Sequence, residues 1–126
     1  MVDGTLFVRP FPKGTKKRTL GTRLAQWAEY IGGLRGSFKV GITNSPKTRS
    51  SARWPDGSTY RTQFPRGNMV VLWYFDTGEA AGMAEAALIR EFYTVRTCLN
   101  KARGDDGRTS SSRYLYVVVQ EGNCSF

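Results

Sequence analysis

Hydrophobic residues recur with the period of a helix in two segments of the chain. Across residues 22–31, apolar side chains return at three- and four-residue steps, and Gly32 and Gly33 follow as a stop signal. Residues 79–95 are rich in alanine and keep the same spacing. A shorter helix is predicted over residues 46–54, because Ser45 suits an N-cap and Pro46 suits the first helical position.

Four other segments have the character of strands, and they span residues 5–9, 37–43, 69–75 and 114–119. In the second of these, Phe38, Val40 and Ile42 alternate with Lys39, Gly41 and Thr43, so the two sets are expected on opposite faces. Residues 69–75 form a continuous apolar run, which is typical of a buried strand. The whole pattern predicts one small α/β domain over residues 1–126, with a mainly antiparallel central sheet flanked by helices.

The charge of the chain is strongly positive and unevenly distributed. It has 126 residues with 19 Lys and Arg against 10 Asp and Glu, a formal net charge of +9. Residues 1–72 hold 13 basic and 3 acidic side chains, so this part carries the excess. A basic loop contributes Lys13, Lys16, Lys17 and Arg18. These residues are expected either to clamp a nucleic-acid backbone or to form a solvated loop, and nucleic acid is the first candidate partner.

The composition also excludes several kinds of chemistry. The chain has no His, so a His general base, a Ser-His-Asp or Cys-His arrangement and a mixed Cys and His zinc site are ruled out. Cys98 and Cys124 are too few for a four-ligand zinc site and are expected to be free thiols. No apolar run approaches the roughly 20 residues that span a bilayer, and no signal peptide is recognised. We therefore expect a soluble, intracellular protein with no membrane partner.

Glu85 is an acidic residue within the apolar stripe of the predicted helix 79–95. At helical spacing it shares a face with Leu88, Ile89 and Phe92. Burial of an uncompensated carboxylate costs several kcal/mol in practice, so a cationic side chain, a metal ion or access to water must offset it. A structural ion pair and a metal site are both consistent with this pattern.

The strand at residues 37–43 and the helix after it form a second candidate unit. Gly41 lets a phosphate or another backbone segment approach the strand closely. Arg49 and Arg53 are four residues apart, so on a helix they share a face from which two guanidinium groups can grip phosphate oxygens. Lys47 adds a further basic side chain there. The alternative interpretation is a solvated basic helix face.

The order and spacing of these residues resemble the GIY-YIG nuclease superfamily. Arg49 follows Gly41 by eight residues, Glu85 precedes Ile89 and Phe92 on one helical face, and a Leu99-Asn100 pair comes later. Residues 39–43 are similar to the Lys-Ile-Gly-Ile-Thr motif of a phage and bacterial subgroup. The resemblance covers about residues 37–100, and a basic loop and helix at about residues 13–33 are inserted before it.

This resemblance implies a metal-dependent endonuclease that hydrolyses DNA phosphodiester bonds by nicking or by cutting both strands. Glu85 then holds a single Mg²⁺ or Mn²⁺ ion, Arg49 grips the phosphate and Lys39 lies beside the attacking water. Lys47, Arg53 and Asn100 complete the contacts to nucleic acid. The implied partner is duplex or branched DNA, with RNA as an alternative. Cutting both strands with one site per chain calls for a homodimer or two successive events.

The chain departs from the family pattern at the residues that accept a proton. The first-motif tyrosine is missing in its usual place; Tyr30 stands at the end of a predicted helix and is an alternative proton acceptor. Arg53 replaces a frequent family His and is a very poor base. A catalytically inactive DNA- or RNA-binding module therefore stays as the alternative function. The aromatic residues Trp27, Trp54, Tyr60 and Trp73 are interpreted as core or cleft packing rather than as base-stacking platforms.

Overall fold

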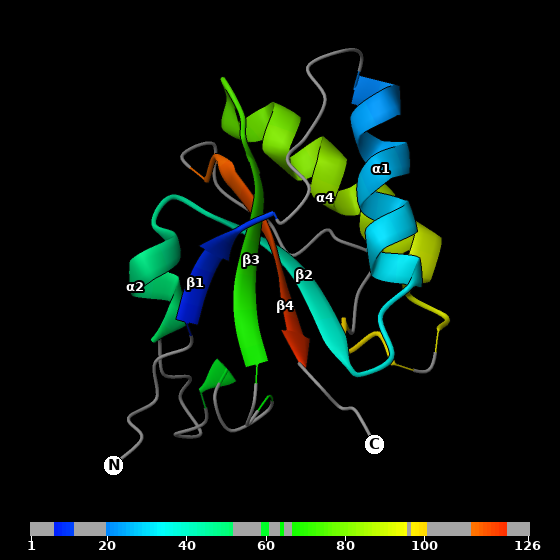
Figure 1. Ribbon diagram of the computed structural model, residues 1–126. Coiled ribbons are helices and arrows are strands. Elements are labelled where there is room, and N and C mark those ends of the chain that lie inside the picture. Colours follow the sequence, from blue (N-terminus) through cyan, green and yellow to red (C-terminus); the bar gives the residue numbers. More distant parts are fainter. Residues whose placement is uncertain are drawn as a thin grey trace.

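The computed structural model describes residues 7–11, 20–51, 59–60, 64, 67–95, 97–100 and 112–120. Its elements in chain order are β1 Phe7–Pro10, α1 Leu20–Gly32, β2 Phe38–Thr43, α2 Pro46–Ser50, β3 Gly67–Tyr74, α4 Gly78–Phe92 and β4 Tyr114–Gln120 (Figure 1). Every helix and strand expected from the sequence is present, and most boundaries differ by one to three residues. The helix α2 is the exception, because it ends at Ser50 with Ser51 as its C-cap, so the expected extension to residue 54 is not confirmed.

The four strands form one sheet in the order β1-β3-β4-β2. β4 pairs antiparallel with both β2 and β3, whereas β1 pairs parallel with β3. The sheet is therefore mixed, and the prediction of a mainly antiparallel sheet is wrong. A parallel pair needs a long crossover connection, which the chain between β1 and β3 supplies by passing through α1, β2 and α2.

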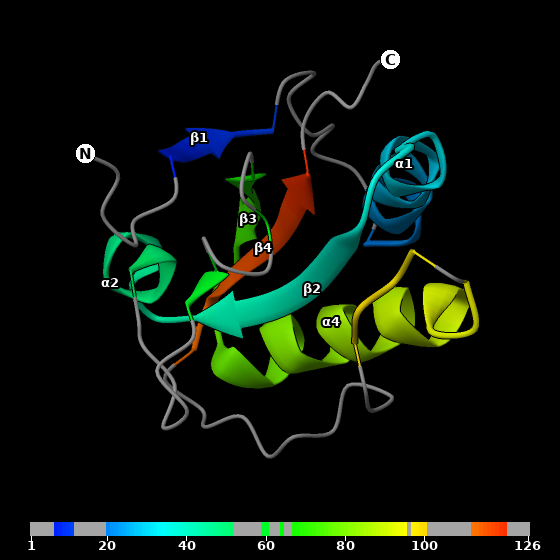
Figure 2. The same cartoon turned by 90° about the horizontal axis from the view of Figure 1, so that it is seen from below.

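The sheet separates two apolar clusters. The first cluster lies between the sheet and the helices α1 and α4, and includes Trp27, Val40, Leu88 and Val117. The second cluster lies on the opposite face and consists of Tyr60, Phe64, Met69, Tyr116 and Val118. Figure 2 shows α4 running along β2, with α1 nearby and α2 at the other end of the molecule.

The two faces of β2 are those that the alternation of its residues predicts. Phe38, Val40 and Ile42 belong to the first cluster. On the other face, Lys39, Gly41 and Thr43 lie opposite Val118, Tyr116 and Tyr114 of β4. A register shift in β3 between Val71 and Trp73 places Tyr74 opposite Tyr114. Tyr114 and Tyr116 of β4 therefore lie on the same face as Lys39, Gly41 and Thr43 of β2, and Tyr74 of β3 lies next to Tyr114.

Two helices begin with the caps that their sequences indicate. The hydroxyl of Ser45 accepts a hydrogen bond from the Thr48 N–H at 3.4 Å, and Pro46 opens α2. Thr77 accepts a hydrogen bond from the Ala80 N–H at 3.1 Å at the start of α4. Within the described residues, none of the helices is long and apolar enough to cross a bilayer.

Candidate functional site

Arg49 and Lys39 converge on the aromatic ring of Tyr60. Arg49 comes from α2, directly after β2, and its guanidinium carbon lies 5.6 Å from the centre of the Tyr60 ring. The ammonium nitrogen of Lys39, on β2, lies 5.8 Å from the same centre. Cations within about 6 Å of a ring centroid are attracted by its electron-rich face. The fold thus brings together two of the side chains that the sequence proposed for one site.

A pair of buried tyrosine hydroxyls lies beside these cations. The hydroxyl oxygens of Tyr60 and Tyr116 are 2.6 Å apart, and each side chain is only 1% exposed. The Arg49 Nε–H donates to the Tyr116 hydroxyl at 3.4 Å. This chain of contacts fixes the guanidinium plane of Arg49 against the second cluster.

Burial keeps both tyrosines protonated to a higher pH than an exposed tyrosine. Loss of hydration raises the pKa of Tyr116 well above its ordinary value, and it raises the pKa of Tyr60 as well. Both are therefore neutral phenols at neutral pH, suited to hydrogen bonding and not to proton abstraction as phenolates. Their hydrogen bond and the Arg49 charge act in the opposite direction on Tyr60 and do not outweigh its burial.

Arg49 keeps its positive charge in this half-buried position. Burial by itself lowers the pKa of the guanidinium, but interactions with Tyr116 and Tyr60 more than compensate, so the pKa is raised overall. A permanently charged, oriented guanidinium is the kind of group that binds a phosphate with defined geometry.

Tyr116 occupies the space that Gly41 leaves open. A Cβ atom at residue 41 would overlap the Tyr116 hydroxyl and would lie 2.6 Å from the Tyr116 Cζ. The glycine is therefore required by the aromatic side chain across the strand pair, and this corrects the interpretation that its space admits a phosphate or a backbone segment. Tyr116 has no signal in the sequence beyond being a tyrosine in the last strand, because its partner depends on the strand register.

Glu85 is buried in α4, as its position in the apolar stripe predicted. It is 2% exposed and shares the buried side of the helix with Leu88, Ile89 and Phe92. Its charge contributes to raising the pKa of Tyr60, after the larger effect of burial. The helix α4 covers the first cluster and packs on β2, which is an edge strand of the sheet. Glu85 and Lys39 therefore lie on opposite sides of β2.

Asn100 supports β2 from its outer edge. Its Oδ1 accepts a hydrogen bond from the Val40 N–H, and its Nδ2 donates to the Val40 carbonyl, each at 2.9 Å. The Cys98 thiol donates to the same Oδ1 at 3.5 Å. Cys98 is a free, buried thiol, as expected, and burial raises its pKa. The amide of Asn100 is thus used to hold the strand that carries Lys39 and Gly41.

Tyr30 lies apart from this group. It belongs to the last turn of α1, and its ring meets the Phe11 ring edge-on with centres 5.1 Å apart. It packs against the first cluster, across the sheet from Tyr116. The structure therefore does not bring Tyr30 together with Arg49, and residues 30–32 end a helix as expected.

The remaining basic and aromatic candidates fall into three groups. Lys47 is exposed in the last turn of α2. Trp27 and Tyr60 are buried core side chains and Trp73 is half-buried, as the packing interpretation predicted. The basic and aromatic candidates that lie outside the described residues are Lys13, Lys16, Lys17, Arg18, Arg53 and Trp54, and the second cysteine, Cys124, lies outside them too.

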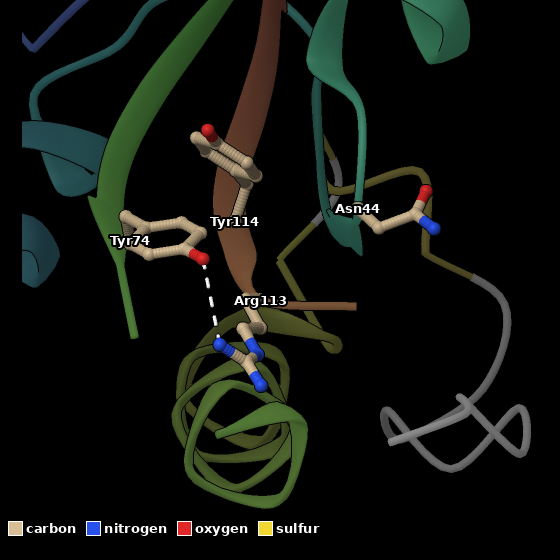
Figure 3. Close-up of a pocket in the computed structure, with 4 residues that line it drawn as sticks. All are labelled: Asn44, Tyr74, Arg113 and Tyr114. Carbon is tan, nitrogen blue, oxygen red and sulfur yellow. Dashed lines mark hydrogen bonds between the residues drawn. The ribbon is translucent and has the colours of Figure 1, made fainter. Parts of the chain in front are cut away.

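A pocket that the sequence did not indicate lies at the end of β2. It has a volume of about 320 Å³ and is lined by Asn44, Tyr74, Arg113 and Tyr114 (Figure 3). The rings of Tyr74 and Tyr114 are 4.6 Å apart between centres and tilted by 54°. Arg113 donates a hydrogen bond to the Tyr74 hydroxyl at 3.5 Å. The pocket combines an aromatic pair with a cation.

No protein-family model matches this chain, and neither the curated proteins nor the solved structures include a significant match to it.

Proposed function

We propose that this protein is a divalent-metal-dependent endonuclease of the GIY-YIG type that acts on DNA. The observation that carries the proposal is the convergence of Arg49 and Lys39 on the ring of Tyr60, with Arg49 hydrogen-bonded to Tyr116, while Glu85 is buried in α4 on the other side of β2. These three residues stand at the spacing of the family motifs, and they come from separate elements, α2, β2 and α4.

In the proposed reaction, Arg49 binds the scissile phosphate. Its hydrogen bond to Tyr116 and its position over Tyr60 orient the guanidinium before substrate arrives. Negative charge accumulates on the phosphate oxygens in the transition state, and a preoriented cation stabilises that charge at little reorganisation cost. Lys39 adds a second positive charge near the same ring and orients the attacking water.

Glu85 supplies a carboxylate of the kind that a hard divalent cation binds. Mg²⁺ is commonly held by one or two carboxylates together with water and substrate phosphate oxygens. Among the described residues, no three Asp, Glu, Cys or His side chains gather at one place, and Glu85 is the carboxylate that this proposal assigns to the ion. When bound, such an ion lowers the pKa of water and polarises the phosphate. The role of Glu85 in this proposal is to hold the ion at the edge of the site.

A second candidate function is a nucleic-acid-binding module without catalysis. The observation that favours it is the position of Tyr30, the alternative proton acceptor, which packs against the first cluster across the sheet from Tyr116 and not beside Arg49. Such a module uses the same cations to bind phosphates. The logarithm of its association constant for duplex DNA should therefore fall with the logarithm of the salt concentration, with a slope of about 0.9 for each neutralised phosphate.

Cleavage of a supercoiled plasmid tests the proposal. Wild-type protein with Mg²⁺ or Mn²⁺ is expected to yield nicked or linear product, and EDTA should abolish it. Glu85→Gln keeps the size of the side chain and removes its charge, so we expect loss of cleavage with DNA affinity retained. Glu91→Gln, at an exposed position of the same helix, is the matched control and should cleave normally.

A thermal melt separates metal binding from folding. An ion that binds only the folded state raises the melting temperature, by an amount that grows with the logarithm of its concentration relative to Kd. Mn²⁺ should stabilise wild-type protein and Glu91→Gln but not Glu85→Gln. A bound plasmid that stays intact with every metal tried, together with no Mn²⁺-dependent stabilisation, would refute the nuclease and support the binding module.

A further inference from the structure

We infer that the pocket formed by Asn44, Tyr74, Arg113 and Tyr114 is a subsite for one unstacked nucleobase of the nucleic-acid substrate. This inference rests on the proposed function in taking nucleic acid as the ligand, and it adds where and how a base is held. It implies a substrate with a single-stranded or splayed region next to the scissile phosphate.

Tyr74 provides the surface on which the base stacks. Its side chain is 52% exposed, although tyrosine is a large aromatic residue at the end of an otherwise largely buried strand. Large exposed aromatic side chains within a pocket are a common feature of ligand sites, because a bound ligand removes much apolar surface from water there. The ring of Tyr114 packs directly against that of Tyr74, with centres 4.6 Å apart, and bounds the same pocket, so it supports the Tyr74 ring on which a planar ligand stacks.

Arg113 gives the pocket a positive charge beside this surface. It immediately precedes Tyr114, is itself exposed, and donates to the Tyr74 hydroxyl, so its guanidinium lies beside the ring of Tyr74 (Figure 3). A nucleotide presents a flat aromatic base next to an anionic phosphate, which matches a tyrosine ring next to a guanidinium. An uncharged aromatic ligand would not use the arginine.

The pocket lies on the same face of the sheet as the proposed phosphate site. Tyr114 and Tyr116 are two residues apart on β4, and residues two apart in a strand point to one face. Thr43, opposite Tyr114, and Gly41, opposite Tyr116, connect the two places along β2. Arg49 belongs to α2, which begins two residues after Asn44, so a strand bound at Arg49 can place a neighbouring base in the pocket.

Equilibrium binding in EDTA tests this subsite without relying on cleavage. The probes are a fluorescein-labelled oligothymidylate and a duplex of the same length, followed by anisotropy. Loss of one base stack weakens binding roughly five- to 140-fold. We expect Tyr74→Ala to lose this much affinity for the single strand and much less for the duplex. Tyr74→Phe keeps the stacking ring and loses only the hydrogen bond from Arg113, so it should lose much less single-strand affinity than Tyr74→Ala.

Met83→Ala is the matched control, since Met83 is a 64% exposed apolar side chain on α4 and lies outside the pocket. A second measurement uses wild-type protein alone, so it does not depend on the folding of a variant. An oligonucleotide carrying 5-iodouracil should photocrosslink to Tyr74 or Tyr114, identified by mass spectrometry. Unchanged single-strand binding by Tyr74→Ala, equal losses for single strand and duplex, or crosslinks elsewhere would overturn the inference. Because no cleavage is involved, an inactive enzyme with a Tyr74-dependent single-strand affinity would refute the nuclease and leave the subsite standing.

Discussion

At the scale of single residues, Gly41 and Tyr116 depend on one another. The ring of Tyr116 uses the space beside Gly41, and in that position its hydroxyl meets both Tyr60 and Arg49. A side chain at residue 41 would therefore displace the group that orients the arginine. Gly41 thus affects the site only through packing: it leaves room for Tyr116, whose hydroxyl orients Arg49.

Replacement of Gly41 by alanine should destabilise the protein and weaken phosphate binding together. Overpacking of a buried position typically costs about 1–3 kcal/mol, and the ring that must move here holds Arg49. Urea unfolding and DNA binding of Gly41→Ala measure the two effects. In Gly82→Ala the new methyl group meets nothing within 4 Å on α4, so we expect a gain of about 0.5–1 kcal/mol from helix propensity. Equal stability of the two variants would contradict the packing argument.

At the scale of elements, β2 owes its position to partners on both of its edges. β4 pairs with it on one side, and residues 98–100 follow it on the other, where Phe38 bridges to Cys98. The Asn100 amide makes both hydrogen bonds that a neighbouring strand would make to Val40. The segment after α4 therefore fixes the strand from which Lys39 projects.

Asn100→Ala should destabilise the fold by about 1–3 kcal/mol, because it leaves the buried N–H and carbonyl of Val40 without these bonds. Asn44→Ala, at an exposed position, is the control and should change stability by no more than about 0.5 kcal/mol. Urea denaturation measures both. If Asn100→Ala instead kept full stability and lost only DNA affinity, Asn100 would be a nucleic-acid contact, as the family resemblance implies.

At the scale of the whole molecule, the sheet carries a different chemistry on each face. The first cluster is closed by α1 and α4 and is almost entirely apolar, whereas the second contains two tyrosine hydroxyls and lies beside two cations. The stability of the whole fold is thereby linked to pH through Tyr60 and Tyr116.

The free energy of unfolding should fall as the pH rises above about 10. Tyrosines of the unfolded chain ionise near pH 10, while burial raises the pKa of Tyr60 and Tyr116 and keeps them protonated in the folded state. The unfolded state then binds fewer protons, so stability is complete below pH 10 and declines through the folded-state pKa values, by up to about 1.4 kcal/mol per pH unit for each tyrosine.

Urea unfolding between pH 8 and pH 11 measures this decline. The double variant Tyr60→Phe/Tyr116→Phe should show a shallower fall than wild type. Val118→Ala removes apolar volume from the same cluster without changing a titrating group, so it should keep the wild-type slope despite lower stability. A double variant with the wild-type slope would show that other groups cause the decline.

The sequence by itself determined the elements and the faces of β2, because helical and alternating periodicities are local properties of the chain. It also determined the burial of Glu85, since the helical spacing places that residue among Leu88, Ile89 and Phe92. The cap at Ser45 and the core positions of Trp27 and Tyr60 follow from equally local or compositional signals.

Only the tertiary structure decided which distant residues meet. The parallel pairing of β1 with β3, the partnership of Gly41 with Tyr116, the Asn100 clamp on Val40 and the pocket at Tyr74 all depend on strand order and register. Tyr60 and Tyr116 are 56 positions apart in the chain, yet they share a hydrogen bond. Strand register is set by the sum of packing and backbone hydrogen bonds over the whole sheet, so no local pattern specifies it.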